Sequence, residues 1–323
     1  MWARVSATQP YAVICQKRKT DSGEQQGRRV PLNNAVVICE NGFRLAQAAT
    51  DSALLEHCDQ SFIDVWWDLT KGLAGAKMED WGDAVAIRSS IPAEIANTLF
   101  VMKQPANAEE LVEKARRFYS GPRPWRIVAN GKSKQSIASA VGTSMTPGAG
   151  SPGMLLVPVP VAFPPPPPSL RIEQVSNEEQ LSEYWKVAAK AFGMPMVMTK
   201  LVIPRVPAAT DSAVLLLGYE GGEPVASGAV ISTEGIAGIY TIGVMPKSRR
   251  RGYGEAITWA AVKAGRERGC KVSYLQASKM GLPIYERMGF KVTAEYPEWF
   301  SKVSVLNKVG AFLYFVGMTI RGA

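Results

Sequence analysis

Five consecutive prolines at residues 164–168 constrain the fold of this chain more than any other feature. Each proline ring fixes φ and removes a backbone N–H, so the run must form a polyproline II rod and cannot join a helix or a central strand. We interpret residues 154–169 as a semi-rigid linker between two domains of the 323-residue chain. A PxxP ligand for a partner protein is the alternative, but the run lies between two folded patterns, which favours the linker.

The net charge of +9 first suggests a nucleic-acid or anionic membrane partner. Residues 1–30 hold six basic and two acidic side chains, a net of +4, and residues 247–251 add another +4 without an acid. The rest of the chain is nearly neutral. A nucleic-acid footprint would be distributed over a face of the protein, so we expect no nucleic-acid partner.

Cysteine and histidine content excludes several chemistries. The four cysteines show no CxxC spacing, and His57 is the only imidazole, so we expect no metal site and no hydrolase based on a catalytic histidine. No secretory signal opens the chain, and the apolar run at 309–320 is too short to span a bilayer. We therefore expect a cytoplasmic protein with free thiols and no membrane partner. The cysteines are Cys15, Cys39, Cys58 and Cys270.

The part before the prolines reads as a flexible leader, residues 1–30, followed by a small α/β domain, residues 31–153. This domain carries no motif that we can connect to chemistry. Its expected elements are a helix from Asp51 to Leu69, a strand at 84–88, a helix at 107–119, a strand at 125–129 and a loop rich in Gly, Ser and Thr at 130–153.

The part after the prolines, residues 170–297, predicts the element order α, α, β, β, β, α, β, α, β, and residues 298–323 form a C-terminal extension. Hydrophobic periodicity and turn residues set the boundaries. The elements are helices at 176–193 and 195–203, strands at 213–219, 225–232 and 236–244, a helix at 252–268, a strand at 272–276, a helix at 282–288 and a strand at 291–296.

Chemistry concentrates between the strand at 236–244 and the helix at 252–268, where the sequence is VMPKSRRRGYGEA. A strand that passes through a glycine-containing turn into a helix presents free backbone N–H groups at the positive end of the helix dipole, which suits a pyrophosphate. Gly252 and Gly254 leave room for the phosphates, and residues 249–251 supply three arginines. A plain surface corner is the alternative reading, and a P-loop motif and a dinucleotide-fold motif are both absent from the sequence.

Residues 249–254, RRRGYG, match the R/Q-x-x-G-x-G/A signature of the GNAT superfamily of N-acetyltransferases, and the preceding VMP at 244–246 also fits. Downstream, LPIYERMGF at 282–290 resembles the closing motif of that family. One helix and one strand separate the two motifs, as in the family. The resemblance implies an α/β (α+β) fold: a mixed, mostly antiparallel central sheet flanked by helices, here preceded by a second, smaller α/β domain.

The resemblance also implies a cofactor, acetyl-CoA, and residues that contact it. Tyr285 would be the general acid that protonates the departing thiolate, because a phenol and a thiol have similar pKa values. A core aromatic beside Phe290 is the alternative for Tyr285. The strand that ends at Val244 would diverge from the strand at 272–276 to admit the pantetheine arm. The implied cofactor contacts are Ile242, Gly243, Val244, Arg249, Arg250, Arg251, Gly252, Tyr253, Gly254 and Ser278.

The sequence departs from the family at the general base, because the strand at 236–244 has no glutamate. The base would be Glu234, a water held by Tyr240 and Thr241, or absent if the amine is already neutral. Met194 and Met196 begin an adaptable apolar stretch that we assign to the acceptor, although methionines at this spacing are also common in cores.

These observations predict an enzyme that transfers an acetyl group from acetyl-CoA to a primary amine of a small molecule. A non-catalytic acyl-CoA sensor and a protein-lysine acetyltransferase are the alternatives. Residues 31–153 resemble the degenerate half of tandem GNAT enzymes of the mycothiol synthase kind. They lack R-x-x-G-x-G, so we expect them to cover the acceptor side without binding CoA.

Overall fold

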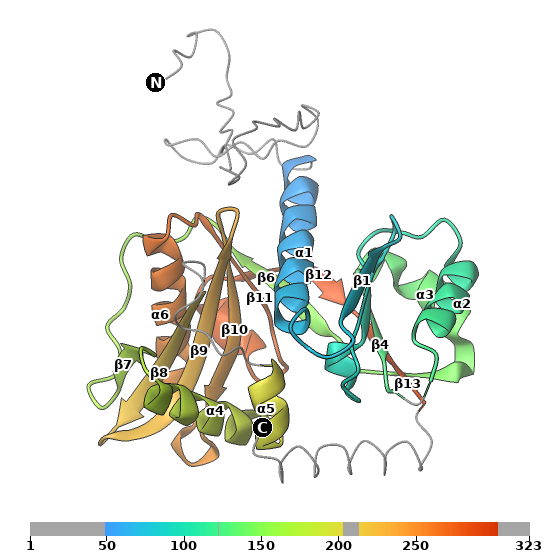
Figure 1. Cartoon of the computed structure of the whole chain (residues 1–323). Coiled ribbons are helices and arrows are strands. Elements are labelled where there is room, and N and C mark those ends of the chain that lie inside the picture. Colours follow the sequence, from blue (N-terminus) through green and yellow to red (C-terminus); the bar gives the residue numbers. More distant parts are fainter. Residues whose placement is uncertain (1–48, 122, 203–212, 303–323) are drawn as a thin grey trace, which may run out of the picture. The chain divides into compact units, whose positions relative to one another are not determined.

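The computed structural model describes residues 49–121, 123–202 and 213–302 and contains two β-sheets with helices packed on them (Figure 1). Both sheets belong to one compact unit that begins at Asp59. The helices are α1 (Ala49–Thr70), α2 (Ala108–Phe118), α3 (Lys134–Val141), α4 (Glu178–Phe192), α5 (Met196–Val202), α6 (Tyr253–Glu267) and α7 (Leu282–Arg287). The strands are β1 (Lys77–Asp80), β2 (Val85–Arg88), β3 (Thr98–Val101), β4 (Arg126–Ala129), β5 (Met145–Pro147), β6 (Ser151–Leu156), β7 (Arg171–Gln174), β8 (Ala213–Glu220), β9 (Glu223–Thr233), β10 (Ile236–Val244), β11 (Val272–Gln276), β12 (Lys291–Tyr296) and β13 (Glu298–Ser301).

The C-terminal sheet has the strand order β7-β8-β9-β10-β11-β6-β12, and its pairs are antiparallel except β10 with β11. Successive side chains of a strand point to opposite faces of its sheet. On β8, Val214 and Leu216 pack in the cluster formed with α6, whereas Leu215 and Leu217 pack in the cluster formed with α4. The two helices therefore cover opposite faces of this sheet.

The two sheets exchange strands. β6 precedes the proline-rich segment, yet it lies between β11 and β12 in the C-terminal sheet. β13 follows the C-terminal sheet in sequence, yet it lies between β4 and β5 in the N-terminal sheet, whose order is β1-β2-β3-β4-β13-β5. Neither sheet is complete without a strand from the other half of the chain, so the halves cannot separate without unpairing a central strand.

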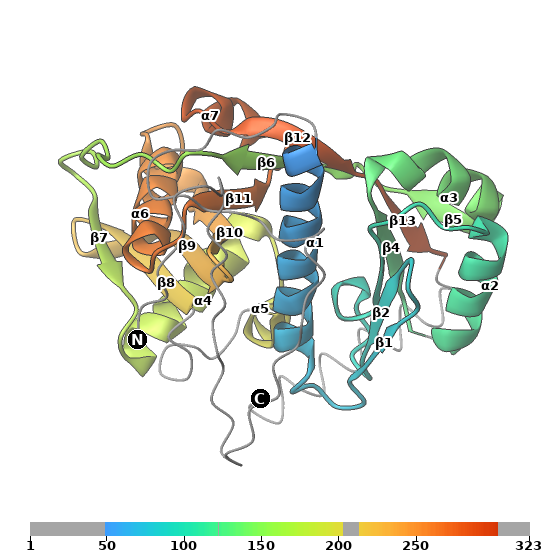
Figure 2. The ribbon, with the colours of Figure 1, turned by 90° about the horizontal axis from the view of Figure 1, so that it is seen from above.

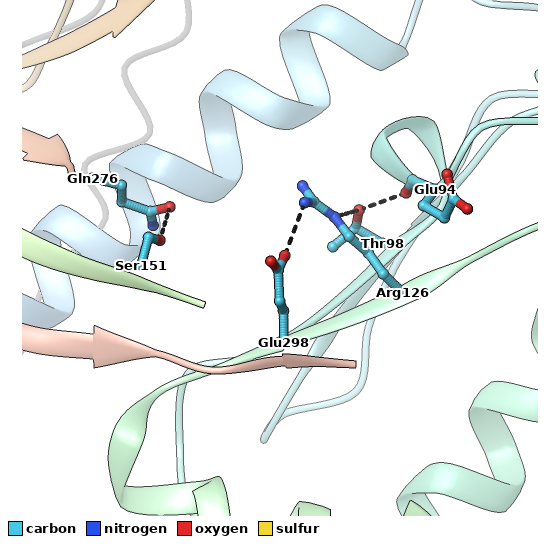
Figure 3. A network of polar contacts seen from close by, with 6 residues as sticks. All are labelled: Glu94, Thr98, Arg126, Ser151, Gln276 and Glu298. Atoms are coloured by element: carbon cyan, nitrogen blue, oxygen red, sulfur yellow. Dashed lines mark hydrogen bonds and ion pairs between the residues drawn. The ribbon is translucent and has the colours of Figure 1, made fainter. Parts of the chain in front are cut away.

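One polar contact joins each exchanged strand to its neighbour in the sheet that receives it (Figure 3). Ser151 on β6 donates a hydrogen bond to Gln276 on β11, at 3.2 Å. Glu298 on β13 accepts a hydrogen bond from Arg126 on β4, at 3.3 Å, and these two side chains are only 21% and 16% exposed. Arg126 also donates to Thr98, at 3.1 Å. β6 is thus joined to β11, and β13 to β4, by side-chain contacts as well as by backbone pairing.

The sheets follow one plan. In each, a parallel pair is connected by a helix: β3 and β4 by α2, β10 and β11 by α6. Next comes the exchanged strand and then an edge strand, β5 or β12, reached through a further helix, α3 or α7. Figure 2 shows α2 and α3 beside one sheet and α6 and α7 beside the other. The six strands of the N-terminal sheet therefore have the same arrangement as β8, β9, β10, β11, β6 and β12 of the seven-stranded C-terminal sheet.

Several boundaries differ from the sequence expectations. Residues 130–153, expected to be a loop, contain α3, β5 and the start of β6, so the expected linker, residues 154–169, begins within β6. The sequence of β6, SPGMLL, predicts a loop because proline and glycine disfavour strands. In the structure, however, Met154 is fully buried between paired strands. Residues 298–301, expected in an extension, form β13. The expected leader, residues 1–30, and residues 303–323 of the extension lie outside the described residues.

Within the described ranges, no helix is both long enough and apolar enough to cross a membrane. The same residues contain no group of three or more His, Cys, Asp or Glu side chains suited to a metal ion. Cys58 and Cys270 are both buried.

Candidate active site

The loop between β10 and α6 presents backbone N–H groups at the start of a helix. Gly252 is the residue before the helix, with φ of 79°, and having no side chain it cannot cap the first turn. The backbone at Arg250 is also left-handed, with φ of 63°. The first N–H groups of a helix have no intrahelical acceptor, and the helix dipole adds partial positive charge there. This loop can therefore receive a phosphate group.

Two of the three arginines in this loop are held by other parts of the chain. Arg249 donates to the carbonyl oxygens of Val244 and Ala191, at 3.2 and 3.0 Å, and so ties the end of β10 to the end of α4. Arg251 forms an ion pair with Glu220, at 2.7 Å, and Glu220 also accepts from the hydroxyl of Tyr253, at 2.6 Å. These contacts lower the pKa of Glu220, first through Tyr253 and then through Arg251. Arg249 and Arg251 therefore shape the loop in addition to adding positive charge.

The corresponding helix of the N-terminal sheet, α2, has the opposite character. Asn107 caps it by accepting from the backbone N–H of Glu110, at 3.0 Å. Glu109 and Glu110 place two negative charges in its first turn. A phosphate at this position would compete with the cap and be repelled by the carboxylates. The start of α2 is therefore less suited to a phosphate than the start of α6, and the absence of CoA binding by the N-terminal half stays a prediction.

β10 and β11 diverge next to this loop. They pair only from Ile236 to Gly238 on β10, although β10 continues to Val244 and β11 to Gln276. On its other edge β11 pairs with β6, from Ser273 to Gln276. The divergence expected between these strands is therefore present, and it leaves the backbone of residues 239–244 unpaired on the side of β11.

A β-bulge interrupts β10 within the divergence. Tyr240 pairs with Ala229 and Gly243 pairs with Ser227, so β10 has one extra residue between the two pairs. Thr241 in the bulge has φ of 50°, which is strained for a β-branched residue. Its hydroxyl is hydrogen-bonded to that of Tyr184, and its carbonyl accepts from Ser227, at 3.2 Å. Strained backbone of this kind is common at functional sites.

Gly243 lies directly after the bulge and packs closely against α4. A Cβ added there would lie 2.8 Å from the Cβ of Ala191, 3.0 Å from the Oγ of Ser227 and 3.2 Å from the ring of Phe192. Glycine is thus required by close approach at this position. Ile242 instead packs with the cluster on the α6 face.

Tyr285 on α7 lies next to α6. It is 8% exposed, its ring centroid lies 5.9 Å from that of Phe290, and Thr258 of α6 is hydrogen-bonded to its hydroxyl. Burial raises the pKa of Tyr285 to about 12, and the Thr258 hydroxyl opposes this shift. Tyr285 is therefore a core aromatic that also remains protonated at neutral pH, as a proton donor must.

The remaining predicted residues are spread more widely. Glu234 lies in the turn between β9 and β10, at the opposite end of β10 from Val244, so the structure does not bring it to the loop. Ser278 accepts from the backbone N–H of Gly281, at 3.1 Å, in the turn before α7. Met194 follows α4 and is half-buried, and Met196 begins α5 with 38% of its surface exposed. Tyr240 packs on the α4 face, with its ring over Gly238.

An apolar hollow lies beside α5. Met198 and Leu201 of α5 line it together with residues of the N-terminal half. Residues of both halves therefore meet at α5, and the expectation that the N-terminal half covers the acceptor side stays a prediction. The other lining residues are Trp66, Leu69, Thr70, Leu73, Ile91, Ile95 and Ala96.

Sequence reasoning missed a buried polar cluster centred on Asp59, which is 4% exposed. Its carboxylate accepts from the hydroxyl of Tyr296 and from the amide of Asn130, the latter at 3.4 Å. Burial, followed by the charges of Tyr274 and Asp59, raises the pKa of Tyr296 far above its ordinary range. An acidic residue among the apolar positions of a helix was the available signal, since Cys58, Phe62 and Val65 surround it in the sequence.

Known proteins agree with this architecture. Residues 181–290 match the family model described as the acetyltransferase (GNAT) family. The structure of a GCN5-related N-acetyltransferase from Kribbella flavida is similar with a TM-score of 0.62 at 16% identity, over 78% of this chain and 97% of that one. A functionally unknown conserved protein from Staphylococcus epidermidis gives a TM-score of 0.54 at 15% identity, over 72% and 97% of the two chains.

A GCN5-related N-acetyltransferase from Sphaerobacter thermophilus gives a TM-score of 0.50 at 17% identity, over 78% of this chain and 91% of that one. At these identities the likeness shows the shared fold alone. The family model covers the bulged strand, the loop and Tyr285, and its match supports acyl transfer in general. Residues 181–290 of this chain therefore form a domain of the GNAT acetyltransferase family.

Proposed function

We propose that the protein transfers an acetyl group from acetyl-CoA to a primary amine of a small molecule. The observation that carries this proposal is the uncapped start of α6 beside the divergence of β10 and β11. Residues 250–254 would hold the pyrophosphate through backbone N–H groups, with Arg249 and Arg251 fixing the loop. When bound, acetyl-CoA supplies the thioester that the amine attacks.

The chain contributes two groups to this reaction. Backbone N–H groups at the bulge, near Gly243 and Val244, would stabilise the negative charge that develops on the carbonyl oxygen. As the new N–C bond forms and the C–S bond breaks, Tyr285 would give its proton to the sulfur and later regain one from water. Burial raises the pKa of Tyr285 to about 12, so the phenol is protonated beforehand but is a weaker acid than an exposed tyrosine. Ser278 would contact the pantetheine arm.

No carboxylate of the described residues lies on β10, and Glu234 is at the far end of that strand. We therefore propose that the amine attacks in its neutral form and that its proton leaves to water near Tyr240 and Thr241. Weakly basic amines should then be the better acceptors. The rate should rise with pH and level off at the pKa of each amine, whereas one midpoint shared by all amines would instead indicate a base on the enzyme.

The direct test follows free thiol after acetyl-CoA is mixed with a panel of amines. Release with at least one amine supports the proposal, and Tyr285→Phe should then lower kcat by about 100-fold or more while CoA still binds. The absence of a carboxylate on β10 favours a second candidate, an acyl-CoA sensor. Tight binding without thiol release on any amine would support the sensor, and acetylated proteins in a treated lysate would support protein-lysine acetylation.

Acetyl-CoA as donor and the buried free thiol of Cys270 fit a cytoplasmic site of action. The charge distribution supports a small-molecule partner, because the positive cluster at 247–251 lies at the proposed phosphate site.

A further inference from the structure

The proline-rich segment between β6 and β7 runs beside α6 (Figures 1 and 2) and contacts it at three places. At the C-terminal end of the helix, Val159 donates to the carbonyl of Lys271 and accepts from Arg266, both at 3.4 Å. In the middle, the ring of Phe163 meets that of Trp259 edge-on, with centroids 5.9 Å apart. At the N-terminal end, the ring of Pro167 lies next to Gly252. A Cβ added to Gly252 would lie 3.6 Å from the Cγ of Pro167. The segment therefore runs antiparallel to α6, from its last turn to its first.

The lengths of the two elements match. Four residues of a polyproline II rod, from Phe163 to Pro167, span about 12 Å, and the seven helical steps from Trp259 to Gly252 span about 10 Å. Proline fixes the conformation of the rod before it packs, so little backbone entropy is lost when it meets the helix. A flexible linker of the same length would not hold these two contacts in register.

The far end of the rod is fastened to the phosphate loop itself. The hydroxyl of Ser169 is hydrogen-bonded to that of Tyr253, the first residue of α6, at 2.9 Å. Tyr253 is 2% exposed, packs with Leu170, and donates to Glu220, which also holds Arg251. One chain of contacts thus connects the rod to the first helical turn and to an arginine of the loop.

We propose that residues 159–170 are a positioning strap for the cofactor loop, which holds the first turn of α6 in the conformation that receives a pyrophosphate. This inference rests on the proposed function. It replaces the linker interpretation of the prolines, since a spacer needs no contact with the helix that it passes. The outer residues of the strap, including Val161 at 80% exposure, have no part in this role.

The test compares Phe163→Ala with Val161→Ala in the full chain. Both changes shorten an apolar side chain of the same segment, but only Phe163 packs against α6. Phe163→Ala should weaken CoA binding about tenfold, because the loss of an aromatic pair changes an affinity by up to about that factor. The KM for acetyl-CoA should rise by a similar factor. The kcat at saturating acetyl-CoA and the KM for the amine should stay within twofold of wild type. Val161→Ala should leave all of these values unchanged.

Hydrogen exchange of the free protein provides a readout that does not depend on the cofactor. Phe163→Ala should speed exchange of amides 256–259, the first N–H groups of α6 that have intrahelical acceptors, while those of β8 and β9 keep their wild-type rates. Ser169→Ala removes only the bond to Tyr253 and should weaken CoA binding two- to fivefold, so it decides the question if Phe163→Ala does not fold. Equal CoA affinity in Ser169→Ala and wild type, or equal exchange at 256–259 in a folded Phe163→Ala, would overturn the strap. A wild-type protein that binds no CoA would instead overturn the proposed function, while the exchange result would still report on the strap.

Discussion

The hydroxyl of Tyr184 on α4 is hydrogen-bonded to the hydroxyl of Thr241 at the bulge of β10. Tyr184 is fully buried, and burial raises its pKa well above the ordinary range, so its hydroxyl remains a neutral donor or acceptor. Thr241 holds a left-handed backbone conformation that costs a β-branched residue about 1–2 kcal/mol. The helix therefore stabilises a strained point of the strand, next to the backbone groups that would meet the acyl oxygen.

Tyr184→Phe should lower the free energy of unfolding by about 1–2 kcal/mol, because the hydroxyl of the half-buried Thr241 loses its partner. It should also lower kcat, since the bulge can relax and its N–H groups would no longer point at the developing charge. Steady-state kinetics and urea unfolding measure the two effects. Tyr219→Phe is the control, because Tyr219 lies in the same cluster and donates to Glu183, at 2.7 Å, away from the bulge. A kcat that falls equally in both variants would contradict a specific role for Tyr184.

Burial of Tyr285 predicts a pH dependence of stability. Its pKa is raised from 10.0 to about 12 in the folded protein, so the unfolded state loses the proton first as the pH rises. The stability due to the buried neutral phenol is fully present below pH 10 and is lost as the pH rises towards 12. The free energy of unfolding, measured with urea at pH 9 to 11.5, should fall more steeply with pH in wild type than in Tyr285→Phe. The two slopes should differ by up to about 1.4 kcal/mol per pH unit. Parallel slopes would mean that Tyr285 titrates normally.

The sequence predicted the C-terminal domain well because its signals are local. Caps, apolar periodicity and turn glycines lie within each element, and the described helices and strands from α4 to β12 follow the predicted order; β7, which precedes α4, was not predicted. The loop at 249–254 could also be predicted, since strand, turn and helix are adjacent in the chain. Tyr285 came only from resemblance to the family, because nothing near it in sequence reveals its contact with Thr258.

The features that were missed depend on contacts between distant residues. β6 pairs with β11 more than 115 residues later, and β13 pairs with β4 about 170 residues earlier, so neither pairing leaves a local pattern. The strain at Thr241 also cannot be read from its sequence, because a threonine inside a β-branched run favours a regular strand. Long-range pairing and packing override local propensity at these positions.

Gly252→Ala should weaken CoA binding with little loss of stability. Its φ of 79° makes alanine unfavourable by about 1 kcal/mol, but the nearest atom to the new Cβ, on Pro167, is at an ordinary contact distance of 3.6 Å. The methyl group would occupy space that a phosphate needs. Gly269→Ala is a matched control, with φ of 86° at the other end of α6 and nothing within 4 Å. Calorimetry should show weaker binding for Gly252→Ala alone, and equal affinities would place the phosphates elsewhere.

The exchanged strand β13 can be tested through Glu298, which pairs with the partly buried Arg126. Glu298→Ala should lower the free energy of unfolding by about 1–3 kcal/mol, because Arg126 keeps its charge and loses its anionic partner in a poorly hydrated place. Glu295→Ala is the control, since Glu295 pairs with Lys134 at 3.8 Å while both side chains are more than 60% exposed. That exposed pair should contribute less than about 0.5 kcal/mol. Urea unfolding at neutral pH measures both, and equal losses would mean that the contact between β13 and β4 contributes no more than a surface ion pair.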